Sequence, residues 1–577
     1  LVGAEHFGLP EAYCGEIRGW LPRRPIGANE AYRGRRTPKP ARAHRRCQPM
    51  RNLHFPGRSP VYATQAMVAT SHPLASQTAL GVLKDGGNAV DAAIAATAVL
   101  CVVEHPMTGI GGDCFALISK PGEKPIALNA SGRAPGALTT ELLLERGITA
   151  IEQQSPHAVT VPGAVDGWAT VLRDHGTRTL KELLQPAIGF ARDGFVIAPR
   201  VAFDWDGSVA KLKNNEGATR HYLVDGKAPT VGSKMRFPAL ADTLAAIAEG
   251  GRDAFYEGDI AADIVAELNA LGGVHTIEDF KRQSASYVEP ISIGYRGLDI
   301  VELPPNNHGV VVLIMLKMME RLGRLSDDPD SPERFHVMLE VARLAYAMRD
   351  ELVADPEMAD VPLDHMLADD TIDALVGRID KSRAMSEVGP VPQPVGTDTV
   401  YLSVVDQNGM AVSFINSLFA DFGSGIATKR TGIMLQNRGQ GFVVKPGHRN
   451  TVEGGKRPLH TLIPALAMRD GELALSFGVM GGAFQPAGHA HVLQNMFDYG
   501  MDVQEALDGQ RVFFDGGKVL VEATASEALR AGLRAKGHDV DERRIPWGGG
   551  QIISVDRKAG VVVGGSDPRK DGLAIGY

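Results

Sequence analysis

The feature that most constrains the fold of this 577-residue chain is a pair of β-strand patterns joined by an Asn-Gly turn. Residues 399–406 (Thr-Val-Tyr-Leu-Ser-Val-Val-Asp) and 410–417 (Met-Ala-Val-Ser-Phe-Ile-Asn-Ser) are both rich in β-branched and apolar side chains. Gln407-Asn408-Gly409 lies between them, and Asn-Gly between two such runs is typical of a β-hairpin. The sequence therefore predicts an antiparallel strand pair over 399–417.

The length of the hairpin loop decides which side chains face each other. With a three-residue loop and Gly409 in the left-handed conformation, Thr399 lies opposite Ser417 on one face of the sheet. With a two-residue Asn-Gly loop, Thr399 lies opposite Leu418 instead. The sequence leaves both registers open. Before the hairpin, residues 383–398 contain three prolines within five residues, so an extended linker or exposed loop is expected there.

Helical patterns occupy much of the remaining chain. Apolar spacing and flanking residues predict helices at 71–84, at 89–103 with Asn88 as the cap, within 163–197 and 235–270, and at 332–350, 484–499 and 503–508. Further strands are expected at 114–119, 432–435, 465–469, 473–478, 551–555 and 561–564. His336 and Glu340 are one helical turn apart; two ligands do not make a metal site, so we interpret them as a solvated helix face.

Composition excludes several functional classes. The chain has 44% hydrophobic and 22% charged residues and a net charge of −8, which is unlike a disordered or collagen-like chain or a basic nucleic-acid binder. The 89–103 helix is too short to span a membrane. Residues 1–49 carry ten Lys/Arg and four acidic residues and are predicted to be a disordered basic tail. With four cysteines, no secretory signal, no metal cluster and no phosphate loop, we expect a cytoplasmic protein without a cofactor.

Thr399 is the candidate for chemistry. A threonine hydroxyl needs a base, and cutting the preceding peptide bond frees an α-amino group, with a pKa of roughly 8, that can serve as that base. The Gly481-Gly482 pair follows an apolar strand pattern and could offer two backbone N–H groups to an oxyanion. By themselves, a Thr at a strand start and a Gly-Gly turn also fit ordinary structural roles.

Ordered motifs make the chain resemble the γ-glutamyltransferase (γ-glutamyltranspeptidase) family of N-terminal-nucleophile hydrolases over about residues 60–577. The motifs lie at 86–93 (Gly-Gly-Asn-Ala-Val-Asp-Ala-Ala), 109–112 (Gly-Ile-Gly-Gly), 399–406, 422–425 (Phe-Gly-Ser-Gly), 456–459 (Lys-Arg-Pro-Leu) and 481–482. The resemblance implies an α+β fold, a four-layer αββα sandwich. It also implies a precursor cut between Asp398 and Thr399, with segments 50–398 and 399–577 as one intertwined heterodimer. Thr399 is then the nucleophile, Ser417 assists it, and Gly481 and Gly482 form the oxyanion hole.

The sequence departs from the family where the substrate would be held. The family's carboxylate-binding arginine aligns with Ser131, and Arg133 lies two residues on. Other family substrate positions align with Phe419, Arg438, Gly441, His460 and Thr461. A free α-amino group would therefore meet Arg438 instead of an aspartate, and like charges in a partly desolvated pocket repel. The segment from Phe442 to Lys456 is short, so we expect the lid of some relatives to be missing.

These departures lead to three alternatives. The first is a self-cleaving amidohydrolase that uses Arg133, Arg438, His460 and Thr461 to bind a small acidic amide, as oxamate amidohydrolase and cephalosporin (glutaryl) acylase branches would. The second is a true γ-glutamyltransferase or glutathione hydrolase. The third is a catalytically silent homologue. The expected partners are a small-molecule amide and the two chains of one precursor as a heterodimer, with no nucleic acid and no membrane. The sequence leaves open whether the heterodimer dimerises further.

Overall fold

The computed structural model describes residues 57–386 and 399–577, and these fold around two facing seven-stranded β-sheets. Asp398 and the predicted basic tail at 1–49 lie outside the described residues. Sheet 1 has the order β19 (Leu573–Gly576), β2 (Met67–Thr70), β10 (Val400–Val405), β11 (Ala411–Ser417), β3 (Asp113–Ser119), β4 (Ile126–Ala130), β7 (Ser286–Val288). Sheet 2 has the order β1 (Val61–Ala63), β18 (Val561–Ser566), β17 (Gly549–Asp556), β13 (Glu472–Met480), β12 (Ala465–Arg469), β9 (Leu298–Glu302), β8 (Ile291–Tyr295).

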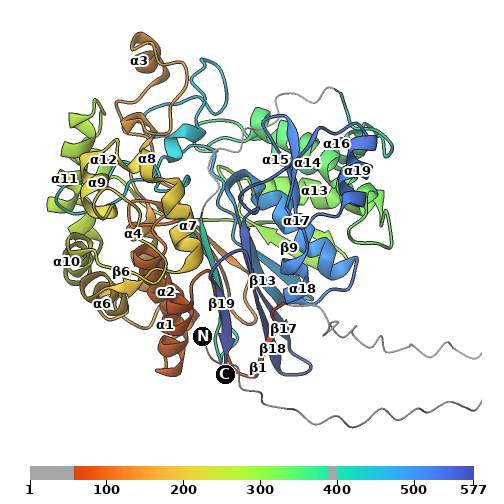
Figure 1. The fold of residues 1–577 in the computed structure, drawn as a ribbon, viewed down its shortest axis with the longest axis horizontal. Helices are drawn as coiled ribbons and strands as arrows, with labels where there is room; N and C mark the ends of the chain where they lie inside the picture. Colours follow the sequence, from red (N-terminus) through yellow and green to blue (C-terminus); the bar gives the residue numbers. More distant parts are fainter. Residues whose placement is uncertain (1–56, 387–398) are drawn as a thin grey trace, which may run out of the picture. The chain divides into compact units, whose positions relative to one another are not determined.

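Helices cover the outer face of each sheet, as Figure 1 shows. Beside sheet 1 lie α1 (Pro73–Lys84), α2 (Ala89–Val103), α4 (Ala164–His175), α5 (Leu180–Leu183), α6 (Gln185–Asp193), α7 (Pro199–Gly207), α8 (Val209–Leu212), α9 (Glu216–Tyr222), α10 (Pro238–Tyr256), α11 (Asp259–Ala270) and α12 (Ile277–Lys281). Beside sheet 2 lie α13 (Gly309–Leu322), α14 (Pro332–Leu352), α15 (Leu363–Leu367), α16 (Asp369–Val376), α17 (Gln485–Phe497), α18 (Val503–Asp508) and α19 (Glu527–Ala535). Helix α3 (Thr140–Glu145) and the strand pair of β5 (Phe195–Val196) and β6 (Lys234–Met235) lie on the same side as the sheet 1 helices.

Strict alternation along the strands produces the four layers. In β3, Phe115 and Leu117 point into the core between the two sheets, whereas Ala116 and Ile118 pack against the helices. The same period of two sends Tyr401 of β10 into the space between the sheets. Each sheet is buried on both faces, by the other sheet on one face and by helices on the other. The architecture is therefore the αββα sandwich that the family resemblance implies. Segments 57–386 and 399–577 both contribute strands to each sheet.

Helix α2 shows why an apolar helix can sit inside this fold. All 15 of its residues are buried, and its start is fixed by Asn88, whose side chain accepts hydrogen bonds from the N–H groups of Val90 and Asp91. The Asp91 carboxylate in turn accepts a hydrogen bond from the Asn88 N–H, which completes a capping box. None of the helices in the described residues is long and apolar enough to cross a membrane.

The hairpin adopts the three-residue loop. Val400 pairs with Asn416 and Val405 with Ala411, a register that continues to Asp406 opposite Met410. Gly409 has a φ of 81°, the left-handed conformation that this loop requires. The register therefore places Thr399 opposite Ser417, and the two-residue alternative is wrong.

Several sequence-based expectations need correction. His336 and Glu340 are both fully buried in α14, because a neighbouring loop covers what the helical pattern alone suggested was a solvated face. Residues 432–435 form no strand and make only isolated bridges, Gly111 to Leu435 and Ala427 to Met434. The helical stretch at 163–197 is divided into α4, α5 and α6, and α10 and α11 are separated at Gly258.

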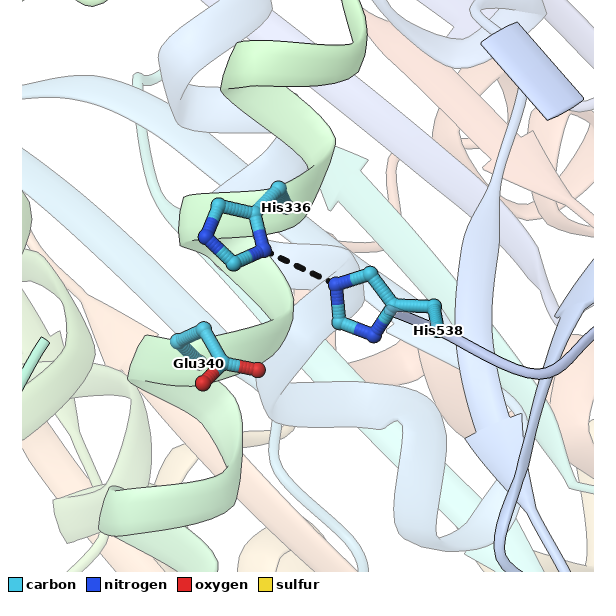
Figure 2. A group of neighbouring side chains, drawn as sticks. All are labelled: His336, Glu340 and His538. Atoms are coloured by element: carbon cyan, nitrogen blue, oxygen red, sulfur yellow. Dashed lines mark hydrogen bonds between the residues drawn. The ribbon is translucent and has the colours of Figure 1, made fainter. Parts of the chain in front are cut away.

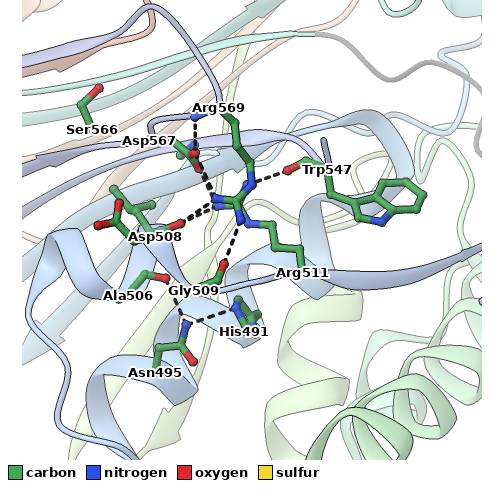
Figure 3. A network of polar contacts seen from close by, with 12 residues as sticks. His491, Asn495, Ala506, Asp508, Gly509, Arg511, Trp547, Ser566, Asp567 and Arg569 are labelled. Atoms are coloured by element: carbon green, nitrogen blue, oxygen red, sulfur yellow. Dashed lines mark hydrogen bonds and ion pairs between the residues drawn. The ribbon is translucent and has the colours of Figure 1, made fainter. Parts of the chain in front are cut away.

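A third sheet of β14 (Val512–Asp515), β15 (Lys518–Val521) and β16 (Val540–Glu542) is tied to sheet 2 by a buried polar network, drawn in Figure 3. The Arg511 guanidinium, fully buried, lies 2.5 Å from an Asp567 carboxylate oxygen and donates to the Trp547 carbonyl at 2.6 Å. Arg569 pairs with the same aspartate and with Glu522. Burial disfavours the Asp567 carboxylate, but Arg511 and Arg569 outweigh it and lower its pKa below the ordinary value of 3.8.

Candidate active site

Three polar side chains form one rung across neighbouring strands of sheet 1. Ser417 at the end of β11 pairs with Asp113 at the start of β3, and Thr399 precedes β10 on the other side of Ser417. Strand alternation points all three toward the space between the two sheets, on the same face as Tyr401 and Phe115. All three are buried, with Thr399 1% exposed.

The hydroxyl groups of Thr399 and Ser417 contact each other directly. Their oxygens are 3.1 Å apart, within hydrogen-bond distance. The Ser417 oxygen also accepts from the Phe419 backbone N–H at 2.8 Å and lies 3.5 Å from the Arg438 guanidinium. A sharp corner after β11, where Phe419 has a φ of 84°, makes the Phe419 contact possible. Ser417 is thus held in place beside Thr399.

Contacts between the sheets indicate which part of β13 faces the start of β10. The hydroxyls of Ser403 in β10 and Ser476 in β13 are 2.6 Å apart, and Tyr401 packs directly over Gly478. Moving two residues toward the start of β10, from Ser403 to Tyr401, therefore corresponds to moving two residues toward the end of β13, from Ser476 to Gly478. Continued by one more step, this pattern would set Thr399 opposite Met480, the residue before Gly481.

The backbone at Gly481 and Gly482 suits an anion. Gly481 has a φ of 129° and Gly482 a φ of 56°, and both precede α17. Within residues 57–386 and 399–577, neither backbone N–H donates a hydrogen bond to a protein acceptor. A Cβ at Gly481 would lie 2.9 Å from the Gly548 Cα, so a side chain is excluded here. Among the described residues the two amides therefore have no acceptor, which is the arrangement that an oxyanion hole requires.

Arg438 is a buried cation that forms no ion pair with any carboxylate of residues 57–386 and 399–577. Its guanidinium donates to the Thr461 hydroxyl at 2.8 Å and stacks 4.0 Å above the Phe419 ring. Asp113 is a charged neighbour, but it forms no ion pair with Arg438, and in the described part of the chain the Arg438 Nε has no hydrogen-bond partner. Burial lowers the pKa of Arg438 to about 9, although Asp113 opposes the shift, so the group is cationic at neutral pH.

His460 and Asp113 form a second fixed pair beside Arg438. His460 Nδ1 accepts from the Leu462 N–H, so Nε2 carries the proton and donates to Asp113 Oδ2 at 3.1 Å. Burial, with Arg438 nearby, lowers the pKa of His460 well below its ordinary value. Burial raises the pKa of Asp113 to about 6, with Arg438 opposing. The ring is therefore neutral and serves to position Asp113.

The structure brings together Thr399, Ser417, Arg438, His460 and Thr461. Arg133 is engaged elsewhere: its guanidinium lies 2.7 Å from Glu357 and 3.7 Å from Asp355, and it donates to the Gly455 carbonyl. No contact between described residues joins Arg133 to the Thr399 group.

Sequence reasoning missed Asp113 as part of the site. The available signal was its position, directly after the Gly-Ile-Gly-Gly turn of 109–112 and at the start of a strand. Ser131, which aligns with the family's carboxylate-binding arginine, accepts a hydrogen bond from the Asn306 side chain, a contact between distant parts of the chain. At the Thr399 rung, the described residues show no group of three His, Cys, Asp or Glu side chains that could hold a metal ion.

Comparisons with known proteins show the family to which this chain belongs. The gamma-glutamyltranspeptidase family model matches residues 75–577. The chain belongs to this family. A solved cephalosporin acylase from Bacillus halodurans is 37% identical, with a TM-score of 0.85 over 92% of this chain and 99% of that one. The chain is accordingly an enzyme of the N-terminal-nucleophile hydrolase kind.

Two curated relatives match this chain over nearly the whole of their own length. A glutathione hydrolase-like YwrD proenzyme of Bacillus subtilis is 36% identical over 89% of this chain and 99% of that protein. An oxamate amidohydrolase proenzyme of Klebsiella pneumoniae is 35% identical over 89% of this chain and 99% of that protein. These family members carry different substrate names, so the substrate of this chain has to be argued from its own residues.

Proposed function

We propose that this enzyme is a self-cleaving amidohydrolase that prefers a small amide carrying a carboxylate and no neighbouring α-amino group. The observation that carries the proposal is Arg438, a fully buried cation 3.5 Å from the Ser417 hydroxyl, with no carboxylate within ion-pair distance among the described residues. A buried, unpaired charge is costly to the fold, and an anionic substrate would neutralise it. The relatives named oxamate amidohydrolase and cephalosporin acylase support this choice.

Cleavage before Thr399 would start the chemistry. The Thr399 hydroxyl attacks the carbonyl carbon of residue 398, the peptide C–N bond breaks as an ester forms, and water hydrolyses the ester. This leaves a carboxylate at the end of one chain and a free α-amino group on Thr399. The relatives' designation as proenzymes supports processing into two chains.

The same residue would then hydrolyse the substrate. Thr399 Oγ1 attacks the amide carbon while its α-amino group takes the proton, and the N–H groups of Gly481 and Gly482 stabilise the oxyanion. The ammonium returns the proton to the leaving amine, which yields an acyl-enzyme ester that water hydrolyses. Ser417 orients the hydroxyl through its 3.1 Å contact. Arg438, with Thr461 and the His460–Asp113 pair around it, would hold the substrate carboxylate.

A true glutathione hydrolase is the second candidate, favoured by the glutathione hydrolase-like relative. It would place a substrate ammonium group close to the Arg438 guanidinium, and like charges in a desolvated pocket repel.

A substrate panel separates the two. The cleaved enzyme is assayed with oxamate, a glutaryl anilide, its uncharged methyl ester and a γ-glutamyl anilide. We expect the glutaryl anilide to exceed both its ester and the γ-glutamyl anilide in kcat/KM. Efficient transfer of the γ-glutamyl group to a dipeptide, with no hydrolysis of the acidic amides, would overturn the proposal.

A further inference from the structure

A second cluster of reactive side chains lies away from Thr399, between α14 and the loop after α19. His336 and Glu340 project from the same side of α14, one turn apart, and His538 faces them, as Figure 2 shows. One nitrogen of each ring and a Glu340 oxygen all lie within 4.8 Å of one another. All three residues are buried, with His336 and Glu340 fully so.

The two imidazoles face each other through ring nitrogens. His336 Nδ1 and His538 Nε2 are 2.8 Å apart. His336 Nε2 lies 2.8 Å from the Asp380 carbonyl, so it carries the proton and leaves the Nδ1 lone pair directed at His538. A neutral His538 that carries its proton on Nε2 donates it to this lone pair, and a metal ion between the two nitrogens would take the place of that proton. A backbone carbonyl behind the ring is also a usual outer partner of a metal-binding histidine.

The remaining hydrogen bonds in the cluster are incomplete. His538 Nδ1 is buried and has no hydrogen-bond partner in the described part of the chain. Glu340 accepts from the Met385 N–H at 2.7 Å and lies 3.2 Å from the Arg343 guanidinium. Each carboxylate oxygen retains a further lone pair, and Arg343 is 12% exposed, so it can turn toward solvent if another cation arrives.

We propose that His336, Glu340 and His538 bind one divalent transition-metal ion, with Zn²⁺ as the best match. Two imidazoles and one carboxylate are a donor set that zinc uses, with water as a fourth ligand. In a tetrahedral site with Zn–N bonds of about 2.0–2.1 Å, the two nitrogens lie roughly 3.3 Å apart. The rings therefore need to separate by only about 0.5 Å, which small side-chain rotations supply.

Such an ion would cross-link two parts of the chain that are far apart in the sequence. His336 and Glu340 precede Thr399 in sequence, whereas His538 follows it. If the precursor is cut as proposed above, the metal would join the two resulting chains and hold the 380–385 stretch against α14. Only this joining of two chains rests on the proposed function; metal binding itself does not require the cut.

The test is a Co²⁺ titration of the full-length, untagged protein after treatment with a chelator. His538→Gln is the main variant, because glutamine keeps a similar size and an N–H donor for His336. His365→Gln is the matched control, since His365 is an exposed histidine on α15. The wild type should bind one Co²⁺ with the visible absorption bands of a tetrahedral site, and one Zn²⁺ should abolish them.

We expect His538→Gln to weaken binding by more than the about 10–100-fold that loss of an outer partner costs, and His365→Gln to match the wild type. Uncut Thr399→Ala should bind as the wild type does, which separates this proposal from the cleavage. Zn²⁺ should raise the melting temperature of the wild type but not of His538→Gln. Absence of a stoichiometric site in the wild type, or equal affinity in His538→Gln, would overturn the proposal.

Discussion

Replacing Arg438 by methionine tests how this enzyme selects its substrate. Methionine fills much of the buried volume and removes only the charge and the hydrogen-bond donors. Hydrogen bonds to charged groups contribute about 1.5–3 kcal/mol, and breaking a buried pair costs about 3–5 kcal/mol. Because Arg438 is fully buried, we take about 3 kcal/mol, which corresponds to roughly a 150-fold loss in affinity.

The assay compares kcat/KM for three anilides on the cleaved fraction of each variant, quantified by denaturing gel. For the glutaryl anilide, we expect Arg438→Met to lower kcat/KM by about 100-fold, mainly through KM. For the uncharged ester the change should be several-fold at most, and for the γ-glutamyl anilide kcat/KM should rise, because a repulsive charge is gone. The matched control is Arg133→Met, whose guanidinium is already paired with Glu357. An equal loss on all three substrates would refute the reasoning, since Arg438 would then be a structural residue.

Three further perturbations test the site and its support. Ser417→Ala removes the hydroxyl beside Thr399 and should slow both precursor cleavage and turnover, measured by gel and by initial rates; unchanged rates in both would contradict its role. Gly481→Ala should lower kcat by about 100-fold or more, because a Cβ strains the backbone at a φ of 129° and displaces an oxyanion donor; an active, cleaved variant would contradict the oxyanion assignment. Asp567, with its pKa lowered, contributes stability that is fully present above pH about 4 and is lost as the pH falls below it. Asp567→Asn should therefore be less stable at pH 7 and show a smaller decline between pH 5 and pH 3, measured by urea unfolding; an unchanged decline would show that other groups cause it.

Local sequence patterns were sufficient to predict the elements that form the core of the sandwich. The capped, wholly apolar 89–103 segment and the Asn-Gly hairpin are specified by short-range signals, namely a cap residue and alternation. The hairpin register depended on one backbone angle at Gly409, so the sequence left two alternatives open. The layer arrangement was predicted from the family resemblance, because no local sequence pattern determines which sheets face each other.

The same distinction between local patterns and long-range contacts applies to the residues of the candidate site. Thr399, Ser417 and Gly481 were predicted as site residues from the hairpin pattern, the glycine pair and the family resemblance. Asp113 and His460 meet although 347 positions separate them in the sequence, and no periodicity reports such a contact. The solvated-face interpretation of His336 failed for this reason, since the covering residue, His538, lies 202 positions away.

The most direct test of the account is the intact mass and N-terminal sequence of the protein after expression and purification. We predict two fragments from this 61.6 kDa chain, of about 42 and about 19 kDa, with the smaller one beginning Thr-Val-Tyr-Leu at residue 399. Thr399→Ala should give one uncut chain. A wild-type protein that remains whole, or whose smaller fragment begins at another residue, would contradict Thr399 as the nucleophile.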